Sequence, residues 1–201
     1  MALYTQEHLA ETLKTLMYEK PLDKITVQEL VARAKVNRKT FYFHFHSIAD
    51  LIKWHYGTVL DEFISNYPLE PDTWVTAFSE LTGMIRKDAD RLNAIFSSSY
   101  SAEFRIYVIR YFDRMVVKFV YSAAQTYEAM TGIKLTLTNQ QLKYINRYYS
   151  MAFFGMTEQW FMNGMVDSSN EFVHIMKQLS NDNMYRTFAV MHEENISTDR
   201  A

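Results

Sequence analysis

Apolar residues recur every three to four positions through most of the chain, which is the spacing of one face of an α-helix. Near the start, leucines at this spacing run from Leu9 to Leu16, Thr5 is a suitable cap before them, and Pro21 stops the pattern. This pattern predicts a first helix over residues 6–19 with one apolar face. Such a face has to pack against other helices.

Two shorter helices follow, joined by a tight turn. Thr26 and Glu29 have the spacing of a capping box, in which two side chains satisfy backbone N–H groups at a helix start. They predict a helix over residues 27–34, after which Lys35 and Val36 form the turn.

The third helix begins after Asn37, which is its predicted cap. Phe41 and Phe45 lie four positions apart on it and are expected to face the first two helices. Ser47 and Asp50 have the spacing of another capping box, which predicts the start of a long fourth helix.

Beyond Pro68 and Pro71 the helical spacing continues almost without interruption. No segment alternates apolar and polar residues with a period of two, so no strand is expected. We therefore predict an all-α fold, with a three-helix domain over residues 1–49 and a larger helical domain over 50–192. The predicted later elements are helices at 50–66, 71–87, 90–98, 101–130, 138–165 and 169–181, and a polar tail at 193–201.

The distribution of charge changes the interpretation of the first domain. The whole chain has a net charge of -2, but residues 1–53 contain eight Lys and Arg against six Asp and Glu, a charge of +2. Over 33–53 the balance is five basic residues against Asp50, or +4. Such a cluster attracts polyanions, although a solvated basic face would show the same charge.

The start of the third helix has the residue types that contact nucleic acid. In a helix-turn-helix, the second helix enters the major groove and presents its N-terminal residues to base edges. Arg38 can bind guanine, Lys39 can do so less specifically, and the Thr40 methyl can meet thymine. Tyr42 and His44 are expected near backbone phosphates.

The segment from Ile25 to Leu51 resembles the N-terminal domain of the TetR family of bacterial transcription regulators. The resemblance rests on ITV before the second helix, F-Y-x-H-F at the end of the third and S-x-x-D-L at the start of the fourth. It implies an all-helical dimer that binds DNA and responds to a small molecule in its C-terminal domain. The expected DNA-contacting residues are Thr26, Lys35, Asn37, Arg38, Lys39, Thr40, Tyr42 and His44.

Three positions depart from the family pattern. Lys35 stands at a turn position that glycine usually holds, and a left-handed conformation there would cost a residue with a β-carbon about 1 kcal/mol. Either the turn is adjusted at this position or the strain is accepted. Val31 replaces a smaller alanine, and Ile48 replaces a lysine that reaches the DNA backbone in many relatives.

The C-terminal part is similar to a Gram-positive subset of the family that includes regulators of dihydroxyacetone kinase operons, over the segment FFGMTEQWFMNGMVDSSNEF. Aromatic and methionine residues between 74 and 165 are mostly ordinary core. Some of them are expected to line an effector pocket between helices. The candidates are Trp74, Phe78, Tyr107, Tyr111, Tyr148 and Gln159.

The predicted helix at 138–165 is apolar on all sides through its middle turns. A helix of this kind needs cover on every side, so a homodimer through this helix and the helix at 169–181 is predicted. Complete burial within one subunit is the alternative. The expected interface residues are Phe154, Gly155, Phe161, Met165, Phe172 and Met176.

Other chemistries find little support in the sequence. His44 and His46 would diverge by about 200° on a helix and have no third ligand nearby, so no metal site is expected. There is no cysteine, no glycine-rich phosphate loop and no nucleophile motif, so neither an enzyme nor a cofactor is predicted. The absence of an N-terminal signal pattern and of a long apolar run favours a cytoplasmic protein without membrane contact.

The predicted function is a ligand-responsive homodimer that binds a pseudo-palindromic double-stranded DNA operator, with repression favoured by family behaviour. The effector is an unknown small molecule. The alternative is a helical interaction module that regulates a protein partner without binding an operator.

Overall fold

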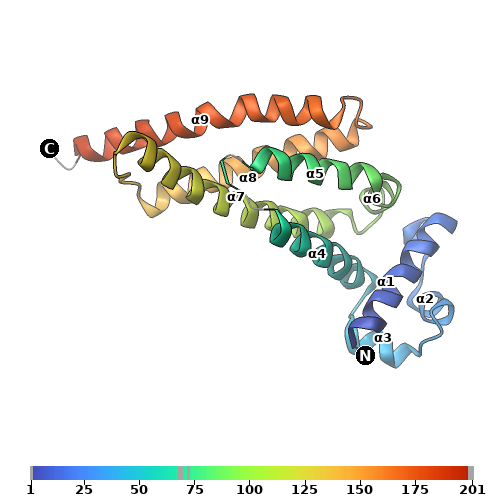
Figure 1. Ribbon diagram of the computed structural model, residues 1–201. Helices are drawn as coiled ribbons and strands as arrows, with labels where there is room; N and C mark the ends of the chain where they lie inside the picture. Colours follow the sequence, from blue (N-terminus) through green and yellow to red (C-terminus); the bar gives the residue numbers. More distant parts are fainter. Residues whose placement is uncertain (1, 68–69, 72, 199–201) are drawn as a thin grey trace. The chain divides into compact units, whose positions relative to one another are not determined.

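The computed structural model describes residues 2–67, 70–71 and 73–198, and all the regular structure in these ranges is helical (Figure 1). The predicted all-α class is therefore confirmed. The elements in order are α1 Ala2–Glu19, η1 Leu22–Lys24, α2 Val27–Arg33, α3 Arg38–His44, α4 Ile48–Asn66, α5 Trp74–Lys87, α6 Ala89–Phe96, α7 Ser101–Thr131, α8 Asn139–Met162 and α9 Ser169–Thr198.

The chain folds into two compact units. The first combines residues up to Phe63 with Lys87–Val108, and the second combines Ile64–Arg86 with the chain from Ile109 onward. The limits of these units fall inside long helices, so they differ from the predicted domain boundary after residue 49. The predicted boundary separates the DNA-binding part from the rest of the chain and remains a prediction.

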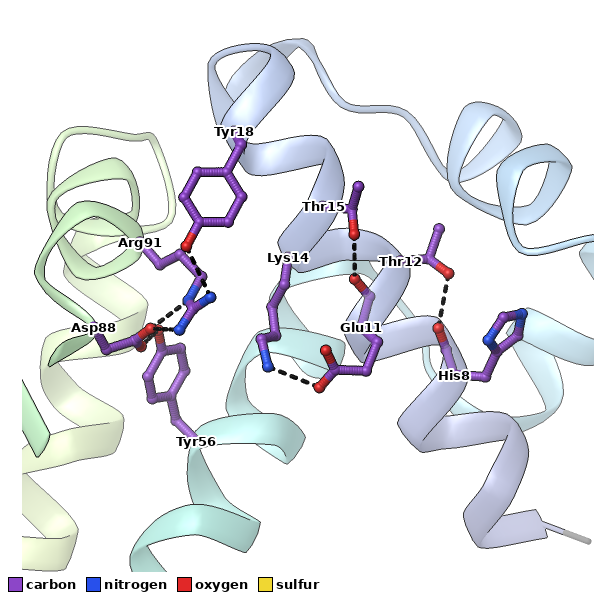
Figure 2. A network of polar contacts seen from close by, with 9 residues as sticks. All are labelled: His8, Glu11, Thr12, Lys14, Thr15, Tyr18, Tyr56, Asp88 and Arg91. Atoms are coloured by element: carbon purple, nitrogen blue, oxygen red, sulfur yellow. Dashed lines mark hydrogen bonds and ion pairs between the residues drawn. The ribbon is translucent and has the colours of Figure 1, made fainter.

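The first unit packs α1, α2 and α3 around an apolar centre. Leu9, Leu16 and Phe41 are fully buried, as expected from their helical spacing. Polar side chains also join α1 to α6, and α4 to the residue before α6, as Figure 2 shows. Arg91 on α6 donates to the Tyr18 hydroxyl at 3.0 Å and also contacts Asp88.

The second unit is centred on aromatic side chains from α5, α7, α8 and α9. Trp74 and Phe78 both meet the Phe153 ring edge-on, at centroid distances of 5.4 and 5.3 Å. Phe119 and Phe172 extend this cluster at 5.7 Å each. Edge-to-face rings at these distances add about 1 kcal/mol per pair beyond the area that they bury.

The start of α1 and the end of α9 differ from the predicted bounds. Helix α1 begins at Ala2, so Thr5 lies inside it and is not its cap, because Ala2-Leu3-Tyr4 contains no helix breaker. Helix α9 continues past residue 181 to Thr198. Met184 and Phe188 continue its buried face, at 1% and 0% exposure, and this packing outweighs the polar segment before them. Of the predicted tail, residues 199–201 lie outside the described residues.

The end of α8 also differs from prediction. The helix stops at Met162, and Gly164 and Met165 follow with φ of 78° and 54°. A left-handed residue after a helix lets N–H groups bond the last carbonyls. Met165 donates its N–H to the Trp160 carbonyl at 2.9 Å. It is therefore a loop residue and does not continue the helix.

Candidate nucleic-acid interface

The turn between α2 and α3 is a closed hydrogen-bonded cap. The Lys35 N–H donates to the Ala32 carbonyl at 3.2 Å, and the Val36 N–H donates to the Val31 carbonyl at 3.0 Å. This pair of bonds is the Schellman arrangement, which requires a left-handed residue after the helix. Lys35 supplies it with φ of 54°, so the chain accepts the strain at this position and does not adjust the turn.

The start of α3 is held by Asn37. Its side-chain oxygen accepts from the Thr40 N–H at 2.7 Å and from the Thr40 hydroxyl at 3.0 Å. The predicted cap is confirmed. Since this oxygen is already used twice, the amide group of Asn37 is what remains to donate toward a ligand.

The structure brings Arg38 and Tyr42 together on the exposed side of α3. The Arg38 guanidinium lies 5.4 Å from the centre of the Tyr42 ring, and one of its nitrogens lies 3.3 Å from the Tyr42 hydroxyl. Both side chains are exposed. An arginine over an aromatic ring keeps its charge while losing part of its rotamer freedom, so it is partly ordered before any partner binds.

The inner side of α3 fixes the helix on the domain. Phe41 is fully buried and Phe45 is 4% exposed. Their rings lie 5.9 Å apart, and Phe45 also meets Trp54 of α4 at 5.8 Å. These contacts hold the exposed side of α3 in a set direction.

Thr26 and His44 lie at the edges of this surface. The Thr26 hydroxyl accepts from the Glu29 N–H at 3.2 Å, which confirms the predicted cap of α2. The Glu29 carboxylate accepts from Lys20 at 2.6 Å. The second bond of the predicted capping box, from the Thr26 N–H to this carboxylate, is therefore replaced by the contact with Lys20. His44 is half-buried, with its ring edge-on to Phe43 at 4.9 Å.

Ion pairs neutralise two of the five basic residues between positions 33 and 53. Arg33 pairs with Glu19 at 2.5 Å, and Lys53 pairs with Asp50 and with Glu103. Within the described ranges, Lys35, Arg38 and Lys39 have no ion pair, and all three are exposed. The positive charge available to a polyanion therefore lies at the turn and at the start of α3.

Two other side chains change the expected surface. Ile48 is 4% exposed, so it belongs to the core and leaves no side chain where the family commonly has a lysine. Phe43, which the sequence reasoning did not select, is 82% exposed on α3. The signal that could have found it is its position two residues after the buried Phe41, on the opposite side of the helix.

The candidate effector residues do not form one group. Trp74 and Phe78 lie in the aromatic core, and Tyr111 is buried with Arg114 4.9 Å from its ring centre. Tyr148 is 69% exposed and Gln159 is exposed, bonded to Asn163. Tyr107 belongs to the first compact unit.

Four of the candidate interface residues are core residues of the single chain: Phe154, Phe161, Phe172 and Met176 are between 3% and 6% exposed. Phe154 meets Phe112 at 5.6 Å, and Phe172 stacks on Trp160 at 5.0 Å. Gly155 is half-buried with open space beside its α-carbon, and Met165 is half-buried in the loop.

Helix α8 is not buried on all sides: one of its faces is buried and another is exposed. Its exposed apolar stripe is Tyr144, Tyr148, Met151 and Met162, with exposures from 41% to 69%. On α9 the corresponding exposed apolar residues are Ile175, Leu179 and Val190. Phe154, Phe161, Phe172 and Met176 are buried, so the apolar side chains that α8 and α9 leave exposed differ from those predicted for the interface.

In the described part of the chain, no three His, Cys, Asp or Glu side chains gather where they could hold a metal ion. None of the helices in that part is long and apolar enough to cross a membrane.

Comparisons with known proteins agree with this geometry. Residues 10–53 match the family model described as "Bacterial regulatory proteins, tetR family", and residues 72–182 match "Transcriptional regulator C-terminal region". The "HTH-type dhaKLM operon transcriptional activator DhaS" of Lactococcus lactis subsp. lactis (strain IL1403) is 29% identical over 65 residues, which span 32% of this chain and 35% of that relative.

A solved structure, "Dihydroxyacetone kinase operon activator DhaS", matches with a TM-score of 0.66 over 94% of this chain and 99% of that chain. The sequences are 17% identical. At this identity the likeness shows a shared fold.

Proposed function

Because the chain belongs to the TetR family of bacterial regulatory proteins, we propose that it binds a pseudo-palindromic operator as a homodimer and releases or tightens it when a small molecule binds. The family consists of DNA-binding transcription regulators and not of enzymes. The observation that carries the proposal is the N-terminal end of α3, where Asn37, Arg38 and Lys39 are exposed and the two cations make no ion pair within the described ranges.

The residues of this surface divide into two proposed roles. Arg38 reads base edges, since its guanidinium can bind the two acceptors of guanine at once. Lys35, Thr26, Tyr42 and His44 contact phosphates and set the register of the domain. Lys39 and Thr40 contact bases or phosphates from the outer side of α3.

The DNA proposal is tested by selecting sequences from a random duplex library with the whole protein. Affinity for the selected duplex is then measured by fluorescence anisotropy at several salt concentrations. The logarithm of the association constant should fall linearly with the logarithm of salt, with a slope of about -0.9 per neutralised phosphate. Salt-insensitive binding would favour the alternative, in which the same surface binds a protein partner.

Substitutions separate the two roles. Arg38→Ala should weaken binding to the selected duplex by about 1–3 kcal/mol and relax the base preference. Lys35→Ala should weaken selected and scrambled duplexes alike and reduce the salt slope by about one phosphate. The matched control is Arg110→Ala, an exposed arginine of α7, which should change neither quantity.

The homodimer is proposed to form through the exposed stripes of α8 and α9. Large apolar side chains in a row on a protein surface mark an interaction site. Tyr144, Tyr148 and Met151 follow each other at intervals of four and three residues, so they share one side of α8. A second copy of the chain would cover them, and two DNA-binding domains would then meet half-sites about 34 Å apart or a multiple of this.

Ligand response is supported by two oxygen atoms in the second unit. The Ser150 hydroxyl is fully buried, and the side-chain oxygen of Asn146 lies one turn away on α8. Neither has a hydrogen-bond partner among the described residues. A buried polar atom without a partner costs about 1–3 kcal/mol, which a polar effector could recover.

A thermal-shift screen of small polar metabolites tests the ligand proposal. A binding compound should raise the melting temperature of the wild-type chain and change its affinity for the selected duplex. The response should weaken in Ser150→Ala and persist in Ser122→Ala, a half-buried serine of α7.

The sign of regulation is the last part of the proposal. Repression is expected from the family, and activation is a second candidate because both relatives are named as operon activators. A reporter driven by a promoter next to the selected operator, with and without the protein, distinguishes them. Action on chromosomal DNA implies a cytoplasmic location, which is part of the same proposal.

A further inference from the structure

We propose that Phe43 reads thymine methyl groups in the major groove and so contributes to the sequence preference of the operator; this inference rests on the proposed DNA binding. Phe43 is 82% exposed, which exceeds every other large apolar side chain described in the first compact unit. Exposing a phenylalanine to water costs the roughly 2 kcal/mol that its burial would release. A partner that covers this ring would recover that free energy.

The position of Phe43 on the helix directs it away from the domain. Residues of a helix advance by about 100° each, so a residue two positions from Phe41 points about 200° away from it. Phe41 is fully buried. Lys39 and Phe43 are therefore the two side chains that project most directly outward, one turn apart on the same line.

The length of α3 keeps both turns within reach of base edges. The helix has seven residues, and at about 1.5 Å per residue it is about 10 Å long. The major groove is about 12 Å wide. A helix of this length fits across the groove, so its second turn need not leave the bases.

The surroundings of Phe43 favour DNA over a protein as its partner. No Asp or Glu occurs between Glu29 and Asp50 in the sequence, while Lys35, Arg38 and Lys39 are exposed there. On this surface Phe43 is an apolar ring among cations, and the exposed Tyr42 ring beside it carries a polar hydroxyl. A duplex matches it, since phosphates line the edges of the groove and thymine methyl groups are the apolar element of its floor.

The ring is also supported on one side. The His44 ring meets the Phe43 ring edge-on, with centroids 4.9 Å apart and an angle of 84° between the planes. An aromatic side chain has only two side-chain torsions to restrict. Phe43 can thus bind a methyl group with a small loss of conformational freedom.

The test uses duplexes selected by the wild-type protein, in which each thymine is replaced in turn by uracil. This exchange removes only the methyl group. In the wild-type protein, at least one position in each half-site should lose about threefold to fivefold in affinity, corresponding to one buried methyl-sized group. In Phe43→Ala the same exchange should cost nothing, because the ring that contacts the methyl is gone.

Two further variants keep the result specific. Phe43→Leu retains an apolar side chain and should keep part of the methyl preference. Thr40→Ser removes the other methyl on this surface that could meet thymine, and it should leave the position read by Phe43 unchanged. Circular dichroism melting of each variant should match wild type, since Phe43 is exposed.

Three outcomes would overturn the inference. If no sequence is enriched in the selection, the proposed operator binding fails and this inference fails with it. If sequences are enriched but uracil is tolerated everywhere, operator binding stands and methyl reading by Phe43 does not. Equal uracil penalties in wild type and Phe43→Ala would assign the methyl contact to another residue.

Discussion

The Tyr56 hydroxyl of α4 donates a hydrogen bond of 2.5 Å to Asp88, the residue before α6 (Figure 2). Burial raises the pKa of Tyr56 far above its ordinary value, with the nearby Asp88 carboxylate adding to this effect. The phenol therefore stays protonated and remains a donor throughout the working pH range. This bond joins α4 to the start of α6, and Arg91 of α6 in turn donates to Tyr18 of α1.

Tyr56→Phe should lower the free energy of unfolding by about 1–2 kcal/mol, because it leaves the Asp88 carboxylate without this donor. Urea denaturation measures the change. The matched control is Tyr18→Phe, whose hydroxyl accepts from Arg91 on an exposed side chain and should cost less than about 0.5 kcal/mol. Equal losses in the two variants would show that burial of Tyr56 adds nothing.

A pH effect is expected at His55. Burial lowers the pKa of its imidazole; Lys14 and Arg91 act in the same direction, while Asp88 and Glu11 oppose them. Below its ordinary pKa of about 6.5, the unfolded chain then binds a proton that the folded chain does not. The contribution of His55 to the free energy of unfolding is fully present above about pH 6.5 and is lost as the pH falls below that value.

The comparison that isolates this effect is the free energy of unfolding at pH 7.5 and at pH 5.5. His55→Gln should lose less stability between these values than wild type, by at most about 1.4 kcal/mol for each pH unit crossed. His46→Gln replaces an exposed histidine and should behave as wild type. A slope that is unchanged in His55→Gln would contradict the assignment.

The strained turn gives a stabilising substitution. Lys35 holds φ of 54°, which costs a residue with a β-carbon about 1 kcal/mol relative to glycine. Lys35→Gly should raise stability by about 0.5–1 kcal/mol, while weakening DNA binding through loss of the proposed phosphate contact. Lys35→Ala loses the same charge but keeps the β-carbon, so it should weaken DNA binding without the gain in melting temperature.

The proposed dimer predicts different effects of a charge at an exposed and at a buried position of α8. Met151→Glu places a charge on the exposed stripe, so it should give a folded monomer by light scattering. Phe154→Glu buries a charge beside Phe112 and should unfold the chain, since uncompensated burial of a carboxylate is strongly unfavourable. Tyr121→Glu, at an exposed site of α7, is the control and should leave the mass unchanged. A dimer that survives Met151→Glu would place the interface elsewhere.

Local features of the DNA-binding helices could be predicted from the sequence because their partners are close neighbours. Thr26 and Asn37 cap α2 and α3 through N–H groups three residues away, and Ser47 accepts from the Asp50 N–H in the same way. The turn at Lys35 and Val36 was also placed by its position within the motif, although the left-handed conformation of Lys35 was left open. Such bonds depend on spacing alone, so spacing was enough to place them.

Burial on the long helices could not be predicted in this way. The apolar residues of α8 exceed what one face can hold, and the sequence does not say which of them meets α5, α7 or α9. Phe154 and Phe172 were expected at a dimer interface and lie in the core, while Tyr148 was expected in a pocket and is exposed. Periodicity identifies an apolar stripe, but its neighbours decide what covers it.

For this protein the sequence alone determined the helical class, the family and the capped start of α3, because all three depend on short-range spacing and on residue types in one segment. Only the tertiary structure decided that Phe43 is exposed, that Ile48 is core and that α9 continues to Thr198. Each of these depends on contacts between residues far apart in the chain. The free energy of burial is set by those contacts and not by local sequence.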